Sequence, residues 1–397
     1  MGRIKTRHVA YVVAAFVSAV VPACGQAVDQ SVDVKVLRPK RMDATAERRA
    51  TLQVADGFTL AVFAEGLGNA RMLALAPDGS ILLTRREEGD VVRLVDADGD
   101  GKAERQDTVL KMKSVHGICV HENTLFLADV KNVYAATIAP DGSIGTPKVI
   151  GEDLPDGGQH PNRTLGVGPD KMLYITVGST CNVCRESNPE LATILRCDLD
   201  GTDRVVFATG LRNTVGFGWH PGTGELWGMD HGIDDMGDDK PGEELNLLEQ
   251  GNDYGWPFVS NSEVNTMMEL PKGMTPEVVL SRNTNPVLLF TAHAAPIGMV
   301  FAPLSSVGEK ESDAFVAFRG SWNRKPASGY SVMRIDFEDG KPVEFLPVVT
   351  GFLMADGISH FGRPAGMVLA KDGSLLFTDD TNGVVYRLTG SGGAIGK

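Results

Sequence analysis

Histidine and arginine residues recur just ahead of short apolar segments in this 397-residue sequence. His160 and Arg163 stand in "GGQHPNRTLGVG", and Arg212 and Asn213 stand in "GLRNTVGFG". A guanidinium group binds a carboxylate through paired, charge-assisted hydrogen bonds, and an imidazole accepts a proton near neutral pH. Brought together, these side chains would bind an organic anion and remove a proton from a neighbouring molecule.

The same positions belong to a unit that occurs six times. Each copy has a polar start, an apolar strand, a turn similar to Pro-Asp-Gly and a second apolar strand, and further strand pairs lie between the copies. This pattern predicts an all-β fold, a six-bladed β-propeller with four-stranded antiparallel blades around a central channel. The polar starts should meet at one mouth of that channel. They include Arg71, His116, His160, Arg163, Arg212, Asn213, His293 and Arg363.

The two ends of the repeat suggest how the ring closes. An apolar segment at 57–67 precedes the first copy, and "VVYRLTG" ends the last. We expect the early segment to complete the final blade, because an open sheet edge invites pairing with another chain. The predicted domains are a linker over 25–50, a catalytic propeller over 51–390 and a C-terminal tail over 391–397.

The first 24 residues are typical of an export signal. They have a basic start, an apolar stretch from Val9 to Val21 and small residues before Cys24. The apolar stretch is shorter than the roughly 20 residues that span a bilayer. "VPAC" also resembles a lipoprotein box, so lipidation of Cys24 and simple cleavage remain equal alternatives. Either predicts a periplasmic or exported protein, held at a membrane only through such a lipid.

Charge and missing motifs exclude several function classes. The formal net charge is −13, and no basic run occurs beyond the N-terminus, so nucleic acid is a poor partner. The sequence also lacks the Gly-x-Ser-x-Gly motif of serine hydrolases and the glycine-rich loops that bind phosphate.

Cys181 and Cys184 form a "CNVC" motif. A local disulfide is favoured over a redox-active pair, and a zinc site has weak support because no second pair follows at the required spacing. Arg185 stands where covalent haem attachment would need histidine.

The segment "DADGDGKAERQD" matches much of a calcium-binding loop. Strands are expected on both sides of it, so a structural calcium site and a plain acidic turn remain equally open. The candidate ligands are Asp96, Asp98, Asp100 and Asp107.

Longer motifs carry a family resemblance that covers nearly the whole chain after the linker. With "QHPNRTLGVGPD", "GLRNTVGFGWHP", "EELNLLEQGNDYGWPFV", "FRGSWNR" and "GRPAGMVLAKDGSLLFTDD", the sequence resembles the soluble sugar dehydrogenases that depend on pyrroloquinoline quinone (PQQ), most closely the L-sorbosone dehydrogenase branch. The resemblance implies a six-bladed propeller with PQQ and Ca²⁺ at the channel mouth. It also implies oxidation of an aldose or sugar aldehyde, with electrons passing to an external quinone or cytochrome.

The resemblance implies roles for individual residues. His160 matches the histidine that removes the sugar's hydroxyl proton while the quinone accepts a hydride, and Arg212 would lie near the reacting end of the quinone. Backbone carbonyls of Gly232 and Ile233 match the calcium-binding turn. Arg319 and Arg324 are alternative matches to a lysine of the glucose enzymes. The expected cofactor contacts are Arg212, Asn213, Arg319, Arg324, Arg363, His116 and Arg163.

Two other readings of the sequence compete with the dehydrogenase: a calcium-dependent lactonase on a similar scaffold, and a non-catalytic propeller that binds glycan or protein. The arginine set and His160 favour the dehydrogenase. Gln159 stands where the glucose enzymes have an acid, which predicts a substrate preference different from glucose. The four tryptophans are expected mainly to pack inside blades; they are Trp219, Trp227, Trp256 and Trp322.

Overall fold

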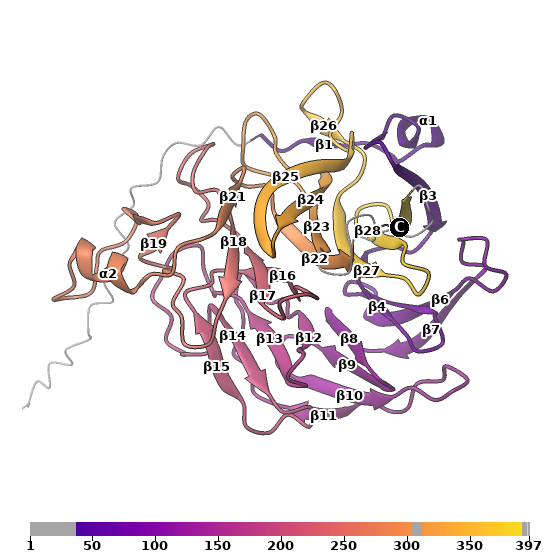
Figure 1. The fold of residues 1–397 in the computed structure, drawn as a ribbon, viewed down its shortest axis with the longest axis horizontal. Coiled ribbons are helices and arrows are strands. Elements are labelled where there is room, and N and C mark those ends of the chain that lie inside the picture. Colours follow the sequence, from indigo (N-terminus) through magenta and orange to yellow (C-terminus); the bar gives the residue numbers. More distant parts are fainter. Residues whose placement is uncertain (1–36, 304–311, 391–394, 396–397) are drawn as a thin grey trace, which may run out of the picture.

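Six antiparallel sheets follow one another along the chain and stand in a ring (Figure 1). The structure is a computed structural model that describes residues 37–303, 312–390 and 395. The predicted signal segment and Cys24 lie outside these residues. The six-bladed propeller expected from the repeat is confirmed. No helix in the described ranges is long and apolar enough to cross a membrane.

The first three blades each take four consecutive strands. They are β4 (Ala70–Leu75), β5 (Ile81–Arg85), β6 (Asp90–Val95) and β7 (Arg105–Lys111); β8 (Gly117–His121), β9 (Thr124–Ala128), β10 (Val133–Thr137) and β11 (Lys148–Gly151); and β12 (Leu165–Val167), β13 (Leu173–Val177), β14 (Thr193–Cys197) and β15 (Val205–Thr209).

The last three blades do not consist of four consecutive strands. The fourth blade takes its outer strand after an inserted hairpin and helix, and the fifth and sixth blades each add a strand from the start of the described chain. They are β16 (Thr214–Trp219), β17 (Leu226–Asp230), β18 (Glu243–Leu248) and β21 (Leu288–Phe290); β22 (Pro296–Pro303), β23 (Ser312–Phe318), β24 (Ser331–Glu338) and β25 (Lys341–Thr350) with β2 (Gln53–Val54); and β27 (Pro364–Leu369), β28 (Leu375–Asp379) and β29 (Val384–Gly390) with β3 (Phe58–Ala64).

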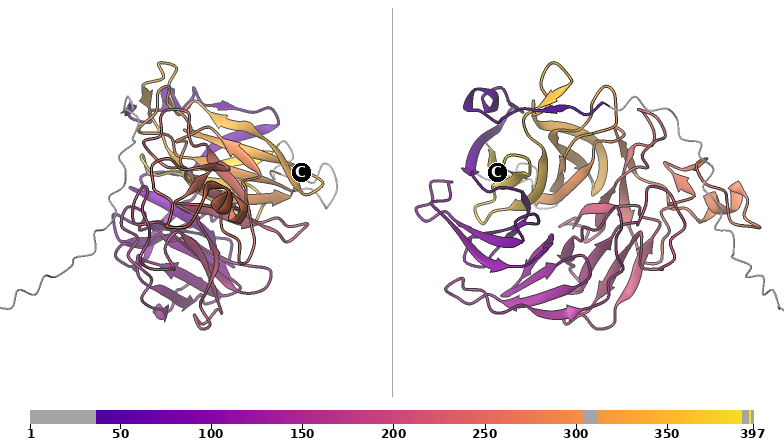
Figure 2. Two further views of the ribbon diagram at one scale, coloured as in Figure 1. Left: turned by 90° about the vertical axis from the view of Figure 1, so that its left-hand side faces the viewer. Right: turned by 180° about the vertical axis from the view of Figure 1, so that it is seen from behind.

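Ring closure occurs in the sixth blade, as the repeat predicts. Strand β3 pairs antiparallel with β29, in a register that runs from Ala64 opposite Val385 to Phe58 opposite Gly390. Segments from the two ends of the described chain thus lie side by side, which both views of the ring also show (Figures 1 and 2). The pairing covers the outer edge of β29.

Small elements decorate the ring. Two of them lie within the stretch expected as a linker: β1 (Lys40–Arg41), which pairs with β26 (Ser359–His360), and α1 (Ala46–Arg49), which is capped by the Thr45 hydroxyl. The hairpin of β19 (Val259–Ser260) and β20 (Glu263–Val264) and helix α2 (Pro276–Arg282) lie outside the ring (Figure 1).

The core lies between neighbouring blades. The second strand of a blade packs on both faces, so β13, β17 and β28 are buried along their whole length and read as continuous apolar runs. Hydroxyl groups on the second strands link neighbouring blades, because each one donates to the backbone where the inner strand of the next blade begins. Thr84 donates to the His116 carbonyl at 3.0 Å, and Thr378 donates to the Arg71 carbonyl at 2.9 Å. These bonds fix the points at which the inner strands begin.

Close packing of the inner strands requires glycine. A Cβ atom on Gly366 would lie 2.1 Å from the Arg71 carbonyl oxygen, and one on Gly298 would lie 2.4 Å from the Ala365 carbonyl oxygen. Real Cβ atoms do not approach so closely, so these two positions set the spacing between consecutive blades.

Candidate active site

A cavity of about 230 Å³ opens where the inner strands begin. Five blades contribute polar side chains to it, which brings together residues up to 292 positions apart in sequence, from Arg71 to Arg363. The wall consists of Arg71, His160, Asn162, Arg212, Asn213, Val215, His231, Gly232, Asp234, Glu243, His293, Ala295, Ile297, Arg319, Trp322, Asn323 and Arg363.

His160 is held as a neutral proton acceptor. Its Nδ1 atom lies 2.8 Å from the Ser179 carbonyl oxygen, which only accepts hydrogen bonds, so Nδ1 carries the proton and Nε2 keeps its lone pair. Burial, and then the positive charge of Arg212, lower the pKa of His160 to about 4. Among the described residues no hydrogen-bond partner is found for Nε2, so this atom is available to a molecule in the cavity.

Packing around His160 leaves no room for a side chain at Gly178. A Cβ atom there would lie 2.5 Å from the His160 Cβ atom and 2.9 Å from the Asn213 Oδ1 atom. In "YITVGS", the glycine that directly follows β13 therefore lets the segment that carries His160 approach the segment that carries Arg212 and Asn213.

An aspartate at the end of β17 fixes the backbone of Arg212 and Asn213, which we call the Arg212 corner. The Asp230 carboxylate accepts the backbone N–H groups of Arg212 and Asn213, both at 2.9 Å. Burial, and then Glu244, raise the pKa of Asp230 to about 7. The sixth blade repeats the arrangement, because Asp379 accepts the backbone N–H of Arg363 at 2.9 Å.

Three arginines gather around one carboxylate. Arg71 and Arg319 both form ion pairs with Asp380, and the Arg319 Nε atom lies 2.6 Å from its Oδ2 atom. Arg363 donates to the Arg319 carbonyl at 3.0 Å and lies over the Tyr330 ring. Burial, and then Arg319, lower the pKa of Arg363 to about 10. Three cations share a single buried anion, so this part of the wall favours a further anionic group.

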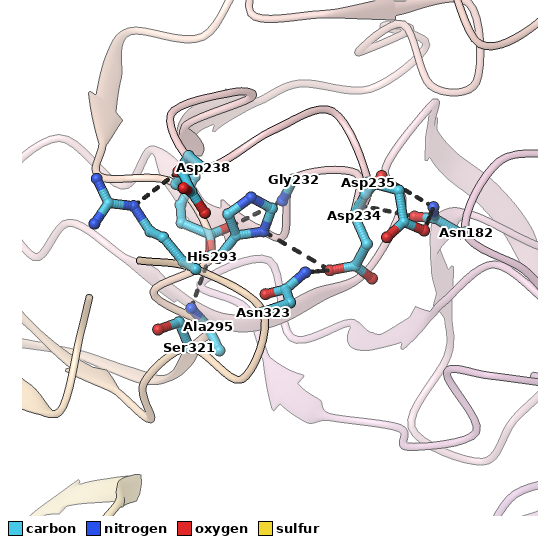
Figure 3. Close-up of polar contacts among 12 residues, drawn as sticks. Asn182, Gly232, Asp234, Asp235, Asp238, His293, Ala295, Ser321 and Asn323 are labelled. Carbon is cyan, nitrogen blue, oxygen red and sulfur yellow. Dashed lines mark hydrogen bonds and ion pairs between the residues drawn. The ribbon is translucent and has the colours of Figure 1, made fainter. Parts of the chain in front are cut away.

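The opposite part of the wall is an acidic turn (Figure 3). The Asp234 carboxylate accepts from the Asn323 amide at 2.9 Å and lies 3.8 Å from the His293 Nδ1 atom. Glu243 accepts the backbone N–H groups of Gly232 and Ala295, both at 2.8 Å. No described residue donates to the carbonyl oxygens of Gly232 or Ile233, which are the kind of oxygen ligand that Ca²⁺ prefers. Gly232 lines the cavity, whereas Ile233 is buried and is not among the lining residues.

Three residues expected to contact a cofactor do not line the cavity. His116 is buried behind the wall, where its Nε2 atom accepts from Arg71 at 3.3 Å. Arg163 is fully buried and donates to the carbonyls of Pro155, His160 and Asn162, because its side chain satisfies the backbone of the histidine loop. Both residues hold the wall from behind.

Arg324 also lies away from this cavity. It donates to the Asp238 carbonyl at 2.8 Å and to the Asp239 carboxylate at 3.0 Å, and so holds the acidic turn. Of the two alternatives in "FRGSWNR", Arg319 is the one at the cavity.

The cysteine motif and the acidic loop are both formed. Cys181 and Cys184 are joined in a disulfide. Carboxylates of Asp96, Asp98 and Asp100 lie within 4.8 Å of one another, but the fourth member is Glu104. Asp107 was expected there, yet β7 begins at Arg105, so Asp107 lies within the strand and its carboxylate pairs with Arg105 at 2.8 Å.

Some functional positions were missed or misread from the sequence. Trp322 is 44% exposed and lines the cavity, so it is not a packing residue as expected. Asp380 ends the "GRPAGMVLAKDGSLLFTDD" motif and Asp230 stands in "MDHG", but neither was singled out, because acidic residues are usually solvated. The acids at the ends of the second strands, Asp230 in "MDHG" and the Asp379–Asp380 pair in "TDDT", are the signal that would have indicated them.

Comparison with known proteins gives one family match over most of the chain. The TrAA12-like family model matches residues 52–391. An uncharacterized protein of Borreliella burgdorferi is 27% identical over 366 residues, which cover 87% of this chain and 92% of the relative. A pyrroloquinoline quinone-dependent sugar dehydrogenase of Hypocrea jecorina is 22% identical over 398 residues, which cover 84% of this chain and 88% of the relative.

A solved structure shares the architecture. The calcium structure of the Trichoderma reesei carbohydrate-active enzyme of family AA12 superposes with a TM-score of 0.75 at 22% identity, and covers 91% of this chain and all of that one. At this identity the likeness establishes the propeller fold.

Proposed function

Because this chain belongs to the TrAA12-like family, we propose that it is a PQQ- and calcium-dependent oxidoreductase that oxidises an aldose or a sugar aldehyde. One observation carries the proposal: an excess of arginine charge and an unprotonated histidine nitrogen line the same cavity. A lactonase that activates water on calcium would have no use for such an excess. The names of the relatives support the same class of reaction.

The residues at the cavity fit both groups. Arg71, Arg319 and Arg363 outnumber Asp380, so they would hold the carboxylates of a polycarboxylic cofactor. The free carbonyls of Gly232 and Ile233 would hold Ca²⁺ beside it. When bound, PQQ supplies the two-electron acceptor, and Ca²⁺ supplies a Lewis acid.

The chain itself would position the sugar and move a proton. His160 Nε2 would accept the proton of the hydroxyl group that is oxidised, because Ser179 holds the ring in the required tautomer. Arg212 would stabilise negative charge that develops nearby. Trp322 would offer its exposed indole face to the sugar ring at the rim. Electrons would then pass to an external acceptor, and the N-terminal sequence suggests that this occurs outside the cytoplasm.

Reconstitution tests the proposal. Purified apo-protein is mixed with Ca²⁺ and PQQ, quinone binding is measured by fluorescence, and dye reduction is followed across aldoses and 2-ketoaldoses. We expect binding that requires both groups, and turnover with at least one sugar. A parent protein that does not bind the quinone would overturn the proposal.

Variants then assign the roles. His160→Ala should lower turnover by about 10²- to 10⁴-fold, the usual contribution of a general base, and leave quinone affinity nearly unchanged. Arg363→Ala should weaken quinone binding first. His121→Ala, at the far end of β8, is the matched control. If the histidine variant loses affinity but keeps its turnover at saturating quinone, the two roles are exchanged.

A further inference from the structure

The disulfide Cys181–Cys184 closes a short loop directly beside the cavity wall. Both cysteines pack with Ile233 and Trp256 in a small apolar cluster. The loop is also tied down at its start, where Thr180 donates its backbone N–H to Glu186 at 2.6 Å. The residues between the two cysteines are therefore held in place.

Asn182, inside this loop, bonds to Arg212 and also to the acidic turn at Asp234 and Asp235, next to which Figure 3 shows it. Its Oδ1 atom accepts from Arg212 Nη2 at 2.9 Å and from the backbone N–H of Asp234 at 2.8 Å. Its Nδ2 atom donates to the Asp234 carbonyl at 3.1 Å. Its backbone carbonyl accepts from Arg212 Nε and Trp256 Nε1, both at 3.1 Å.

These contacts use most of the donors of Arg212. The side chain is 4% exposed, and Nη2 also forms an ion pair with Asp234 at 3.0 Å. Among the described residues Nη1 has no hydrogen-bond partner, which leaves this nitrogen for a molecule in the cavity. A guanidinium group is planar, so fixing Nε and Nη2 also fixes the direction of Nη1.

We propose that Asn182 is a positioning residue: the disulfide-closed loop presents its amide and carbonyl so that Arg212 is fixed against Asp234 with one nitrogen directed at the cavity. An amide suits this role, because its oxygen accepts two hydrogen bonds while its nitrogen, on a separate atom, donates. Aspartate would accept but could not donate, and would bring a third negative charge to Asp234 and Asp235.

A kinetic experiment tests the part of this inference that rests on the proposed function. In the reconstituted enzyme, Asn182→Ala should lower kcat by up to about 100-fold, the effect of a small misplacement of a reacting group. KM and quinone affinity should stay near the parent values, because the cluster of Arg71, Arg319 and Arg363 is untouched. Asn285→Ala, an exposed amide near α2, is the control and should change nothing.

A double-mutant cycle separates positioning from general damage. If Asn182 acts through Arg212, adding Asn182→Ala to an Arg212→Ala background should lower kcat/KM by less than 2-fold. Full additivity of the two losses would overturn the inference. So would a parallel fall in melting temperature and quinone affinity, which marks simple destabilisation.

Crystal structures of the apo-protein variants decide, without any cofactor, whether Asn182 positions Arg212. In Asn182→Ala, and in the Cys181→Ser/Cys184→Ser variant, the Arg212 guanidinium should leave its position beside Asp234. If Arg212 stays in place in both variants, the inference is wrong. Absence of quinone binding in the parent would overturn the proposed function alone, and this structural comparison would still decide the role of Asn182.

Discussion

Two of the histidines that line the cavity, His160 and His293, have pKa values shifted in opposite directions. His160 lies near the positive charge of Arg212, which disfavours protonation of its ring. His293 donates its Nε2–H to the Gly237 carbonyl at 2.8 Å and lies beside Asp234. Burial disfavours the cation in both rings, but in His293 the hydrogen bonds to Asp234 and Gly237 outweigh it and raise the pKa. The surroundings thus favour the neutral form of His160 and favour the protonated form of His293 more than water does.

Histidine titration in the apo-protein tests this difference. NMR of the imidazole Cε1–H signals, assigned with the His160→Ala and His293→Ala variants, should give a pKa of about 4 for His160. The pKa of His293 should lie above its ordinary value of 6.5. A base with a lowered pKa stays neutral in weak acid, so proton acceptance by His160 should persist to about pH 5. Titration of His160 at 6.5 or above would contradict this assignment.

Sequence reasoning located the cationic side chains but not the groups that hold them. Arg212, Arg319 and Arg363 stand in motifs, whereas the role of Asp380 depends on Arg71 and Arg319, which lie 309 and 61 positions away in the sequence. A local pattern cannot report such a partner. The prediction for Arg163 was wrong in the opposite way. Its charged side chain stands in a motif, yet it donates to backbone carbonyls instead of facing the cavity.

The inner strand is the element that positions the site. Five of the six inner strands, β8, β12, β16, β22 and β27, contain a glycine at which a Cβ atom would come within 3.0 Å of the next blade. In the sixth blade Arg363 precedes Gly366, whose Cα faces the Arg71 carbonyl. The strand therefore couples the spacing of two blades to the spacing of two cavity arginines.

Enlarging that glycine should disturb both stability and binding. Gly366→Ala would place Cβ 2.1 Å from the Arg71 carbonyl oxygen, so the blades must separate. Overpacking of this kind costs about 1–3 kcal/mol, measurable by denaturant unfolding. Quinone affinity should fall as well. Gly145→Ala, which meets only ordinary contacts near Thr137, should leave both unchanged; equal stability of the two variants would show that the inner strands tolerate wider spacing.

Element boundaries were predictable where the pattern was periodic. Runs bounded by Pro-Asp-Gly turns indicated the strands of the blades, and β3 was expected in the last one. The docking of β1 on β26 was not foreseen, because two exposed residues in a polar stretch have no periodicity to detect. Asp107 was misplaced for a similar reason. The length of the loop between β6 and β7 decides which acid joins the cluster of Asp96, Asp98 and Asp100, and the spacing of acids along the sequence does not reveal that length.

Stability of the whole ring depends on the closing strand. Phe63 and Ala64 of β3 are buried against the first blade, in a cluster that also includes Leu73 and Leu376. This cluster joins strands from the sixth and first blades, so its loss would open the ring and not merely fray one sheet.

A charge placed on the inner face of β3 tests this dependence. Ala64→Asp would bury an unpaired carboxylate, which costs about 3–5 kcal/mol. We expect a lower melting temperature with a single cooperative transition, and weaker quinone binding. Ala61→Asp, on the exposed side of the same strand, is the control. If both variants melt like the parent, the packing of β3 against the first blade contributes little to stability. If Ala64→Asp melts in two steps, the blades unfold independently.

The pairing of β3 with β29 joins Thr59 to Thr389, 330 positions later in the chain. A nascent polypeptide exposes the first of these segments almost at once and the second only when synthesis is nearly finished. The early segment must therefore wait, unpaired, while five blades take shape. Contacts so distant in sequence slow folding, and a transcript that ends a few dozen codons early would yield a ring with a permanent gap.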